Sequence, residues 1–399
     1  MHIKLLLPML LLSFLTSCGS NNKENSHLPG DIFNPNGINN QTFDINEKKF
    51  VHNLFKSEYL WADRVDSSID YTSYSTPSEL IKGLRVTPPD KWSFSLTKKE
   101  YDDFTNQKTE GFGFGYTKDF TIFLVRIGSP AYDKLYRGDK ILRINGETAS
   151  YETLQKAKNT TRFTVLRNGK EKVVSVTPSA YSFQVTLGKI LTQNQTKIGY
   201  LRYDSFTSSS VTEFEKEFTK FKAANISELI IDLRYNGGGS VAVASTLLDN
   251  ITNQYSGQRQ GYMDWNDNNK NQNQNFSFSD EVEPNDLNMK RVVFLVTKNS
   301  ASASELVISA LKPYLGNSNV ITIGDNTHGK NVGMSGKSYG SNYYFLINFF
   351  IKNDADESTS FDGIAPTCTA EDDITHKMGD ENEAMLHTAL SYLTNGTCP

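Results

Sequence analysis

A serine in a turn and a lysine after a glycine are the residues whose types and positions suggest covalent chemistry. Ser302 lies in the segment Asn299-Ser-Ala-Ser-Ala-Ser-Glu305, after the apolar run Arg291–Thr297 and before a helical apolar spacing. A strand, a tight turn and a helix would expose its hydroxyl beside free helix amides, which favour a developing negative oxygen. The segment predicts a nucleophile for acyl transfer, although Ser300 and Ser304 fit the repeat as well.

Lys330 ends the loop that follows a second apolar strand, Val320–Gly324. At a reference pKa near 10.4, fewer than about 1 in 1,000 lysines are neutral at pH 7, so a lysine base needs a pKa about three units lower. Burial can supply such a change. His328 lies in the same loop, but histidines are common in surface loops, and we expect no direct catalytic role for it.

A glycine-rich loop follows a third strand and can complete the site. The strand Glu228–Arg234 precedes Asn236-Gly-Gly-Gly239, where glycine lets the backbone approach a substrate closely. Neighbouring parallel strands of an open α/β sheet place such loops around one crevice. The loop and the Ser302 turn are therefore expected to form an oxyanion hole.

The elements around these loops predict a layered α/β core over residues 181–399. Strands and helices alternate after about residue 180, as in sheets covered by helices. Residues 264–286 interrupt this pattern with polar, asparagine-rich sequence, which we interpret as a solvated excursion. Before the core, residues 47–97 have amphipathic helical spacing and predict a small helical subdomain.

Residues 98–180 carry an ordered set of motifs. The set comprises Gly111-Phe-Gly-Phe-Gly115, Arg137-Gly-Asp-Lys-Ile-Leu-Arg-Ile-Asn-Gly146 and the strand Phe163–Arg167. It closely resembles a PDZ domain of bacterial proteases. PDZ domains add a peptide to a sheet edge and bind its terminal carboxylate through backbone amides. The resemblance implies that Phe112, Gly113 and Phe114 form the carboxylate-binding loop.

The three catalytic segments, in this order after a PDZ-like region, resemble the C-terminal processing peptidases, also called tail-specific proteases. That resemblance implies a multi-domain α/β serine endopeptidase with a Ser-Lys dyad. By position, Ser302 would be the nucleophile, Lys330 the general base, and the amides of Ala303 and Gly238 the oxyanion hole, with Gly237 as the alternative. The resemblance also implies peptide or protein substrates, and it implies no cofactor.

The chain departs from the family where a polar partner of the base is often found. Four residues beyond Lys330 the family often has Gln or Glu, whereas this chain has Met334. Asn331 is one substitute, but the sequence alone does not select it. The departure leaves an alternative function open, a peptide-binding lipoprotein of the same fold that cleaves weakly or not at all.

The beginning of the chain predicts export and lipid anchoring. Residues 1–17 have a basic tip and an apolar stretch too short to span a bilayer. Leu15-Thr-Ser-Cys18 resembles a bacterial lipobox, which makes Cys18 the expected lipidated residue and residues 18–46 a flexible tether. The membrane and the face that it occupies, periplasmic or cell-surface, are not specified. In an exported protein, Cys368 and Cys398 are a candidate disulfide, and two free thiols are the alternative.

Composition and context exclude other classes. A net charge of −4 provides no basic field for phosphates, so we expect no nucleic-acid partner. Gly324–Lys330 matches a phosphate-binding loop, but Asn331 replaces its Ser/Thr and glycines break the helix that should follow. Ser309-Ala-Leu-Lys312 fits the S-x-x-K motif, but it lies inside a helix without companion motifs. Scattered histidines and cysteines predict no metal site. The oligomeric state is not specified.

Overall fold

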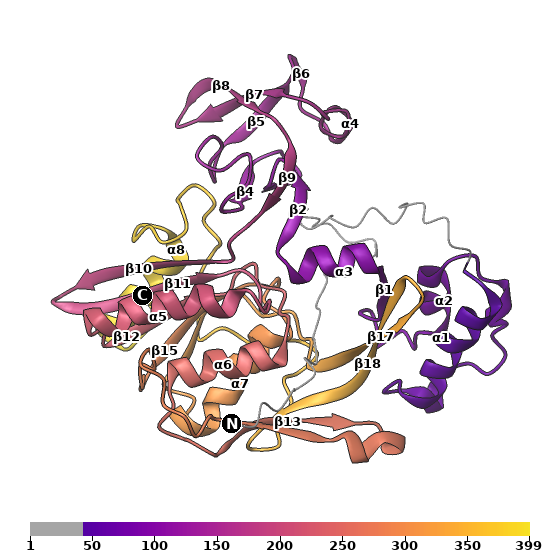
Figure 1. Ribbon diagram of the computed structural model, residues 1–399. Coiled ribbons are helices and arrows are strands. Elements are labelled where there is room, and N and C mark those ends of the chain that lie inside the picture. Colours follow the sequence, from indigo (N-terminus) through magenta and orange to yellow (C-terminus); the bar gives the residue numbers. More distant parts are fainter. Residues whose placement is uncertain (1–42) are drawn as a thin grey trace.

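The computed structural model describes residues 43–399. Figure 1 places a small β module at the top, the helices α1 and α2 beside β17 and β18 at the right, and a sheet covered by helices at the left. The predicted signal peptide, the lipidation site Cys18 and all but the last residues of the predicted tether lie outside the described residues. None of the helices in residues 43–399 has the length and apolar character needed to cross a bilayer.

The larger sheet is mostly parallel and has the strand order β10-β11-β12-β15-β16-β19. Only β10 runs antiparallel to its neighbour, while the other pairs are parallel. Its strands are Thr186–Gln193 (β10), Thr196–Tyr203 (β11), Glu228–Asp232 (β12), Val292–Val296 (β15), Val320–Gly324 (β16) and Cys368–Thr369 (β19).

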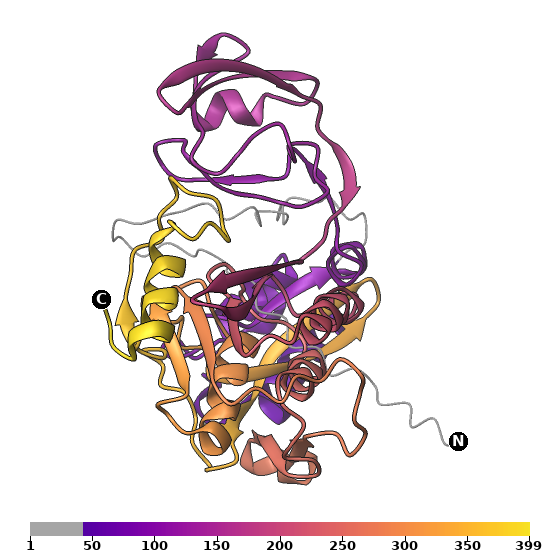
Figure 2. The ribbon, with the colours of Figure 1, turned by 90° about the vertical axis from the view of Figure 1, so that its left-hand side faces the viewer.

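Helices cover both faces of this sheet because its strands alternate apolar side chains between the faces. On β12, Leu229 and Ile231 pack with the helices α5, α6 and α7, whereas Ile230 packs with α8 on the opposite face. Figure 2 shows α8 on its own side of the sheet. These helices are Ser210–Ala224 (α5), Val241–Ile251 (α6), Ala303–Leu315 (α7) and Ala384–Asn395 (α8). The arrangement confirms the predicted layered α/β core.

A second sheet joins segments that are far apart in the sequence. It has the order β1-β18-β13-β14, and β17 also pairs with β18. The helices α1 and α2 pack on its apolar side chains. The strands are Phe94–Thr97 (β1), Arg259–Trp265 (β13), Gln274–Ser277 (β14), Val332–Tyr339 (β17) and Asn342–Asn353 (β18), and the helices are Ile45–Ser57 (α1), Pro77–Leu84 (α2) and Lys98–Thr105 (α3).

The polar segment 264–286 is mostly exposed, as its composition predicts, and part of it has regular secondary structure. The strand β14 pairs with β13, and a short 3-10 helix, Asp267–Gln272, connects them. The side-chain amides of Asn266 and Asn269 donate to Tyr59 O (2.8 Å) and Ser57 O (2.6 Å), just after α1 and at its end. The asparagines therefore satisfy carbonyls that the end of a helix leaves unpaired.

The small β module comprises residues 108–182. Its four-stranded sheet has the order β6-β5-β7-β8, and two further pairs, β3-β4 and β2-β9, complete it. Its elements are Lys108–Gly111 (β2), Phe114–Tyr116 (β3), Ile122–Val125 (β4), Lys140–Ile144 (β5), Glu147–Thr148 (β6), Tyr151–Gln155 (α4), Thr161–Arg167 (β7), Lys170–Val176 (β8) and Ser179–Ser182 (β9). Because β2 pairs with β9, the chain enters and leaves the module through neighbouring strands.

A disulfide joins Cys368 on the edge strand β19 to Cys398 near the end of the chain. The pair closes a loop with a sequence separation of 30 residues. We expect Cys398→Ser to lower the free energy of unfolding by about 2–4 kcal/mol, because the reduced chain gains entropy when unfolded. Urea unfolding of the two proteins would measure this difference, and equal midpoints would contradict the prediction.

Candidate active site

Ser302 lies at the turn between β15 and α7. Its backbone has φ 58° and ψ −113°, a conformation that residues other than glycine rarely adopt. Its amide donates to Glu305 Oε2 at 2.8 Å, which holds the turn in this shape. The hydroxyl is buried and has no hydrogen-bond partner within the described chain. A strained turn with an unengaged hydroxyl is typical of a functional residue.

Hydrogen bonds distinguish the three serines that the sequence left open. Ser300 Oγ donates to Leu233 O at 2.7 Å, and Ser304 Oγ donates to Asn236 O at 2.9 Å. Both hydroxyls therefore fasten the turn to the neighbouring glycine-rich loop. Of the three, only Ser302 has a hydroxyl that is not used in this way.

The glycine-rich loop after β12 lies directly against the Ser302 turn. Ala301 N donates to Asn236 O at 3.1 Å. The amide of Gly238, the first choice for the oxyanion hole, donates to Asn236 Oδ1 at 2.8 Å in this conformation. Among the described residues, the amides of Gly237 and Ala303 donate to no group. The assignment of Gly238 stays a prediction, and Gly237 has the amide that is available without rearrangement.

Lys330 is buried at the end of the loop that follows β16. Desolvation by burial lowers the pKa of its ammonium to about 7, and the charges of Asp90 and Glu305 oppose that decrease. At this pKa roughly half of the side chains are neutral near pH 7. Lys330 and Ser302 line one small cavity, so the structure brings together the two residues that the sequence singles out.

Glu305 connects the serine turn to the lysine loop, a role that the sequence did not reveal. Its Oε1 accepts from Thr327 Oγ1 (2.5 Å) and Gly329 N (2.7 Å), and its Oε2 accepts from Ser302 N (2.8 Å) and Lys330 N (2.9 Å). Burial raises the pKa of this carboxyl, and these hydrogen bonds oppose the increase. The Ser302-x-x-Glu305 spacing was a detectable signal, but it is equally typical of an ordinary helix cap.

His328 lies in the lysine loop with both ring nitrogens close to other groups. Its Nε2 accepts from Trp92 Nε1 at 3.2 Å, and its Nδ1 lies 3.2 Å from Lys298 O. Both ring nitrogens are therefore engaged. Burial lowers the pKa of the imidazole to about 4, so the ring is neutral near pH 7.

The N-terminal subdomain contributes a negative charge near the base. The buried carboxylate of Asp90 accepts from Tyr59 OH (2.8 Å), Ser93 Oγ (2.6 Å) and the amides of Trp92 (2.8 Å) and Ser93 (3.0 Å). Its charge raises the pKa of Lys330. Met334 is also buried in the apolar cluster of this subdomain, so its side chain cannot provide a polar partner for the lysine.

Asp90→Asn is expected to move the pH dependence of activity to lower pH. Removing the negative charge lowers the pKa of Lys330, and a larger fraction of the lysine is then neutral at a given pH. The midpoint of the acidic limb of kcat/KM should fall by about half a pH unit or more. A midpoint that stays in place or rises, in a folded variant, would show that Asp90 does not act on Lys330.

A cleft of about 1050 Å³ lies between the small β module and the core. Phe123 and the neighbouring β3–β4 turn line one side of it. Tyr235, Lys298 and Asn299, which adjoin the glycine-rich loop and the Ser302 turn, line the other side. The cleft is large enough for a peptide segment, and Lys298 and Asn299 connect its wall to the Ser302 turn, although Ser302 and Lys330 themselves do not line it.

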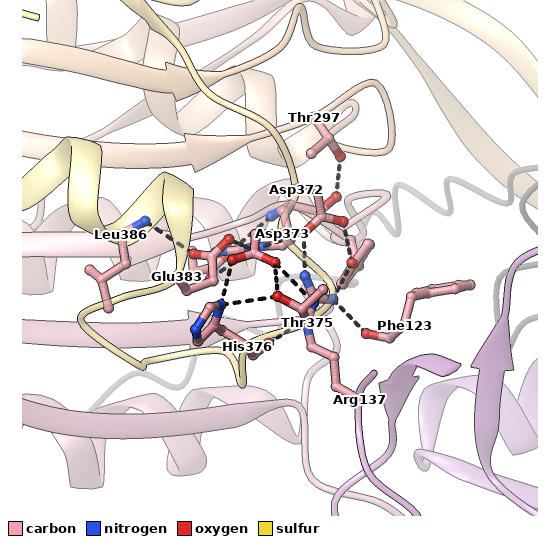
Figure 3. A network of polar contacts seen from close by, with 12 residues as sticks. Phe123, Arg137, Thr297, Asp372, Asp373, Thr375, His376, Glu383 and Leu386 are labelled. Carbon is pink, nitrogen blue, oxygen red and sulfur yellow. Dashed lines mark hydrogen bonds and ion pairs between the residues drawn. The ribbon is translucent and has the colours of Figure 1, made fainter. Parts of the chain in front are cut away.

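Polar contacts fasten the small β module to the core beside this cleft (Figure 3). Arg137 donates to Asp372 Oδ1 and to Tyr235 OH, each at 2.5 Å. Asp372 Oδ1 also accepts from Arg234 Nη1 at 2.8 Å, and Arg234 is paired with Glu383. Arg234 and Tyr235 directly precede the glycine-rich loop. These contacts therefore connect the small β module to the end of β12, from which the glycine-rich loop begins.

The two phenylalanines of the loop expected to bind a carboxylate pack against the apolar core of the small β module, Phe114 buried and Phe112 partly buried. The centroids of Phe112 and Phe114 lie 5.1 and 5.6 Å from that of Phe163. Gly113 has φ +87°, and a Cβ there would lie 2.1 Å from Ser129 Cβ. The loop conformation therefore requires glycine, and any peptide contact would involve its backbone.

Comparisons with known proteins identify the family. The profile of peptidase family S41 matches residues 197–370, and that of the peptidase S41 N-terminal domain matches residues 46–94. Together they cover more than half of the chain. The chain belongs to the C-terminal processing peptidases of family S41, which confirms the resemblance noted in the sequence. Neither profile includes the small β module.

Similar proteins agree with this assignment. A carboxyl-terminal-processing protease of Picosynechococcus sp. is 28% identical over 218 residues, which cover 51% of this chain and 49% of that protein. A carboxy-terminal-processing protease of Bartonella bacilliformis is 24% identical over 257 residues, covering 59% and 56%. The chain thus spans about half the length of the curated relatives it matches.

The fold also occurs in a solved structure. A Bacteroides fragilis NCTC 9343 protein assigned to the S41 proteases superposes with a TM-score of 0.74 at 23% identity, over 87% of this chain and 97% of that one. At this identity the likeness establishes the shared fold.

Proposed function

We propose that this protein is a serine endopeptidase that cleaves peptide bonds with Ser302 as nucleophile and Lys330 as general base. One observation carries the proposal: Ser302, whose hydroxyl has no hydrogen-bond partner among residues 43–399, lies on a strained turn and lines the same buried cavity as a lysine whose pKa is lowered to about 7. A nucleophile and a base that is neutral near working pH are what acyl transfer without histidine requires.

In the proposed mechanism, Ser302 Oγ attacks the carbonyl carbon of the substrate while its proton passes to Lys330 Nζ. The amide of Ala303 and a glycine amide of the Asn236–Gly239 loop stabilise the resulting oxyanion. Collapse of the intermediate breaks the C–N bond, and the lysine returns the proton to the leaving amine. Water then hydrolyses the acyl-enzyme, with Lys330 again acting as the base.

A serine-reactive fluorophosphonate probe tests the proposed nucleophile. We expect covalent label on Ser302, identified by mass spectrometry, and no label in Ser302→Ala. Label on Ser304 would show that the nucleophile is Ser304 and that the assignment of Ser302 is wrong. A folded protein that binds peptides with apolar C-termini but neither cleaves them nor takes up label between pH 6 and 10 would instead be a peptide-binding protein.

The small β module is proposed to act as a PDZ domain that recognises or gates the C-terminus of a substrate. Its position across the cleft from the Ser302 turn supports this role. Because Phe112 and Phe114 both pack against the apolar core of the module, alanine substitutions there would also remove core contacts. Changing the substrate avoids this problem: a peptide with a free C-terminal carboxylate should be cleaved faster than its amidated counterpart, and equal rates would contradict the role.

We further propose that the protein is exported and anchored by lipid on Cys18, so that it acts on exported proteins or peptides. The Cys368–Cys398 disulfide supports export, because such bonds persist in oxidising compartments. Mass spectrometry of the membrane fraction should find a lipid-modified Cys18 as the first residue. Recovery of Cys18→Ser from the same fraction would contradict the anchor.

A further inference from the structure

The cavity that Ser302 and Lys330 share also contains a polar group that no proposed step uses. Its volume is about 10 Å³, close to that of one water-sized sphere. Asn331 lines it too, and the Oδ1 atom of Asn331 is buried without a hydrogen-bond partner in residues 43–399. Leaving a buried carbonyl oxygen unpaired is unfavourable, so this acceptor calls for an explanation.

The orientation of the Asn331 side chain is fixed by its other contacts. Nδ2 donates to Thr359 O at 2.6 Å, and the backbone oxygen of Asn331 accepts from Ile351 N at 3.0 Å. Rotating the amide by half a turn would set Oδ1 against the carbonyl oxygen of Thr359, where neither atom can donate. The carbonyl group of Asn331 is therefore held on the side of the amide opposite to Nδ2, and both Asn331 and Thr359 line the cavity.

We propose that Asn331 is the positioning residue of the lysine base, with Oδ1 accepting a hydrogen bond from the Lys330 ammonium that forms during catalysis. The inference rests on the proposed Ser-Lys mechanism. As the Oγ–C bond to the substrate forms, the Ser302 proton moves to Lys330 Nζ. The ammonium then has one more N–H to donate than the neutral amine, and Asn331 Oδ1 receives it.

This arrangement would favour the transition state over the resting enzyme. Among residues 43–399 no group donates to Asn331 Oδ1. An ammonium is a stronger donor than a neutral amine, so a hydrogen bond to this oxygen would stabilise the charged lysine more than the neutral one. Contacts of this kind are often absent or long in unliganded enzymes and tighten when substrate binds. The family position that often carries a polar partner is occupied here by the buried Met334, and Asn331 would supply that function from the residue next to the base.

Two substitutions that should move the pKa of Lys330 in opposite directions test the proposal. Asn331→Asp adds a negative charge beside the ammonium, so the midpoint of the acidic limb of kcat/KM should rise by about one pH unit. Asn331→Leu removes the acceptor, so the midpoint should fall and kcat should decrease about tenfold with little change in KM. If Asn331 only supported the loop, Asn331→Leu would leave the midpoint in place, whereas the added charge of Asn331→Asp would raise it whatever the role of the residue.

Ser309→Ala is the matched control, because Ser309 lines the same cavity from α7. Its midpoint should equal that of the wild type. The proposal is overturned if Asn331→Leu, folded by circular dichroism, keeps the wild-type midpoint, or if its losses fall entirely on KM. Fluorophosphonate labelling distinguishes failure of the proposed function from failure of the role of Asn331. An unlabelled wild type refutes the Ser-Lys function. A labelled wild type, with Asn331→Leu at the wild-type midpoint, refutes only the role of Asn331.

Discussion

Replacing Lys330 by methionine is expected to lower kcat for peptide hydrolysis by about a thousandfold or more, within the range that general bases contribute. Methionine has a similar length and is apolar, so it suits the buried position without accepting a proton. The variant should fold and should lose fluorophosphonate reactivity at Ser302. Steady-state kinetics and labelling rates, both measured from pH 5 to 9, would establish the effect.

The pH profile of the wild type provides the second half of this prediction. Because the pKa of Lys330 is lowered to about 7, the base is protonated below that pH and neutral above it. kcat/KM should therefore rise with pH around a midpoint near 7, and Lys330→Met should lack this limb. Lys312→Met on α7 is the control, and it also tests the rejected S-x-x-K motif. Retention of more than a tenth of the activity in Lys330→Met would exclude the lysine as base.

Replacing Glu305 by leucine is expected to reduce stability as well as activity. The substitution leaves four donors unpaired in the interior, the amides of Ser302, Gly329 and Lys330 and the hydroxyl of Thr327. Each unsatisfied donor costs about 1–3 kcal/mol, so the free energy of unfolding should fall by about 3 kcal/mol or more. Activity should fall with it, because the serine turn and the lysine loop lose their common anchor.

Glu305→Gln separates the carboxylate from the shape of the side chain. Each carboxylate oxygen accepts two hydrogen bonds, and glutamine keeps only one of the two oxygens. The variant should therefore lie between wild type and Glu305→Leu in urea unfolding. If Glu305→Leu unfolded at the same urea concentration as the wild type, the anchoring role would be wrong.

Local patterns in the sequence predicted the helices and strands of the core and the positions of the loops that follow its strands. The alternation of strands and helices gave the layered core, and the apolar runs before Ser302 and Lys330 placed both at the ends of parallel strands. Neighbouring parallel strands have their carboxyl ends at the same edge of the sheet, so the strand pattern alone predicts that the two loops lie close together. The family resemblance then restricted the chemistry of the loops.

The contacts that sequence reasoning missed join segments far apart in the chain. No periodicity in residues 47–97 shows that Asp90 lies near Lys330, because the second sheet brings them together by pairing β1 with β18. The asparagines near residue 266 have a composition typical of solvent-exposed sequence, yet two of them donate to backbone carbonyls at the end of α1 and just after it. Met334 gave the only local hint, since an apolar residue at a polar position suggested a different support for the base.

The packing of Met334 against the N-terminal helices limits how the modules of this protein can be exchanged. Asp90 and Trp92 reach the lysine loop from the same subdomain, so a chain that began after it would keep the serine but lose the surroundings that set the proton affinity of the base. The small β module enters and leaves through the neighbouring strands β2 and β9 and is the more natural unit to transplant. An engineered chimaera should therefore keep the N-terminal helices together with the catalytic core, and exchanging only the β module would test its proposed role in substrate recognition.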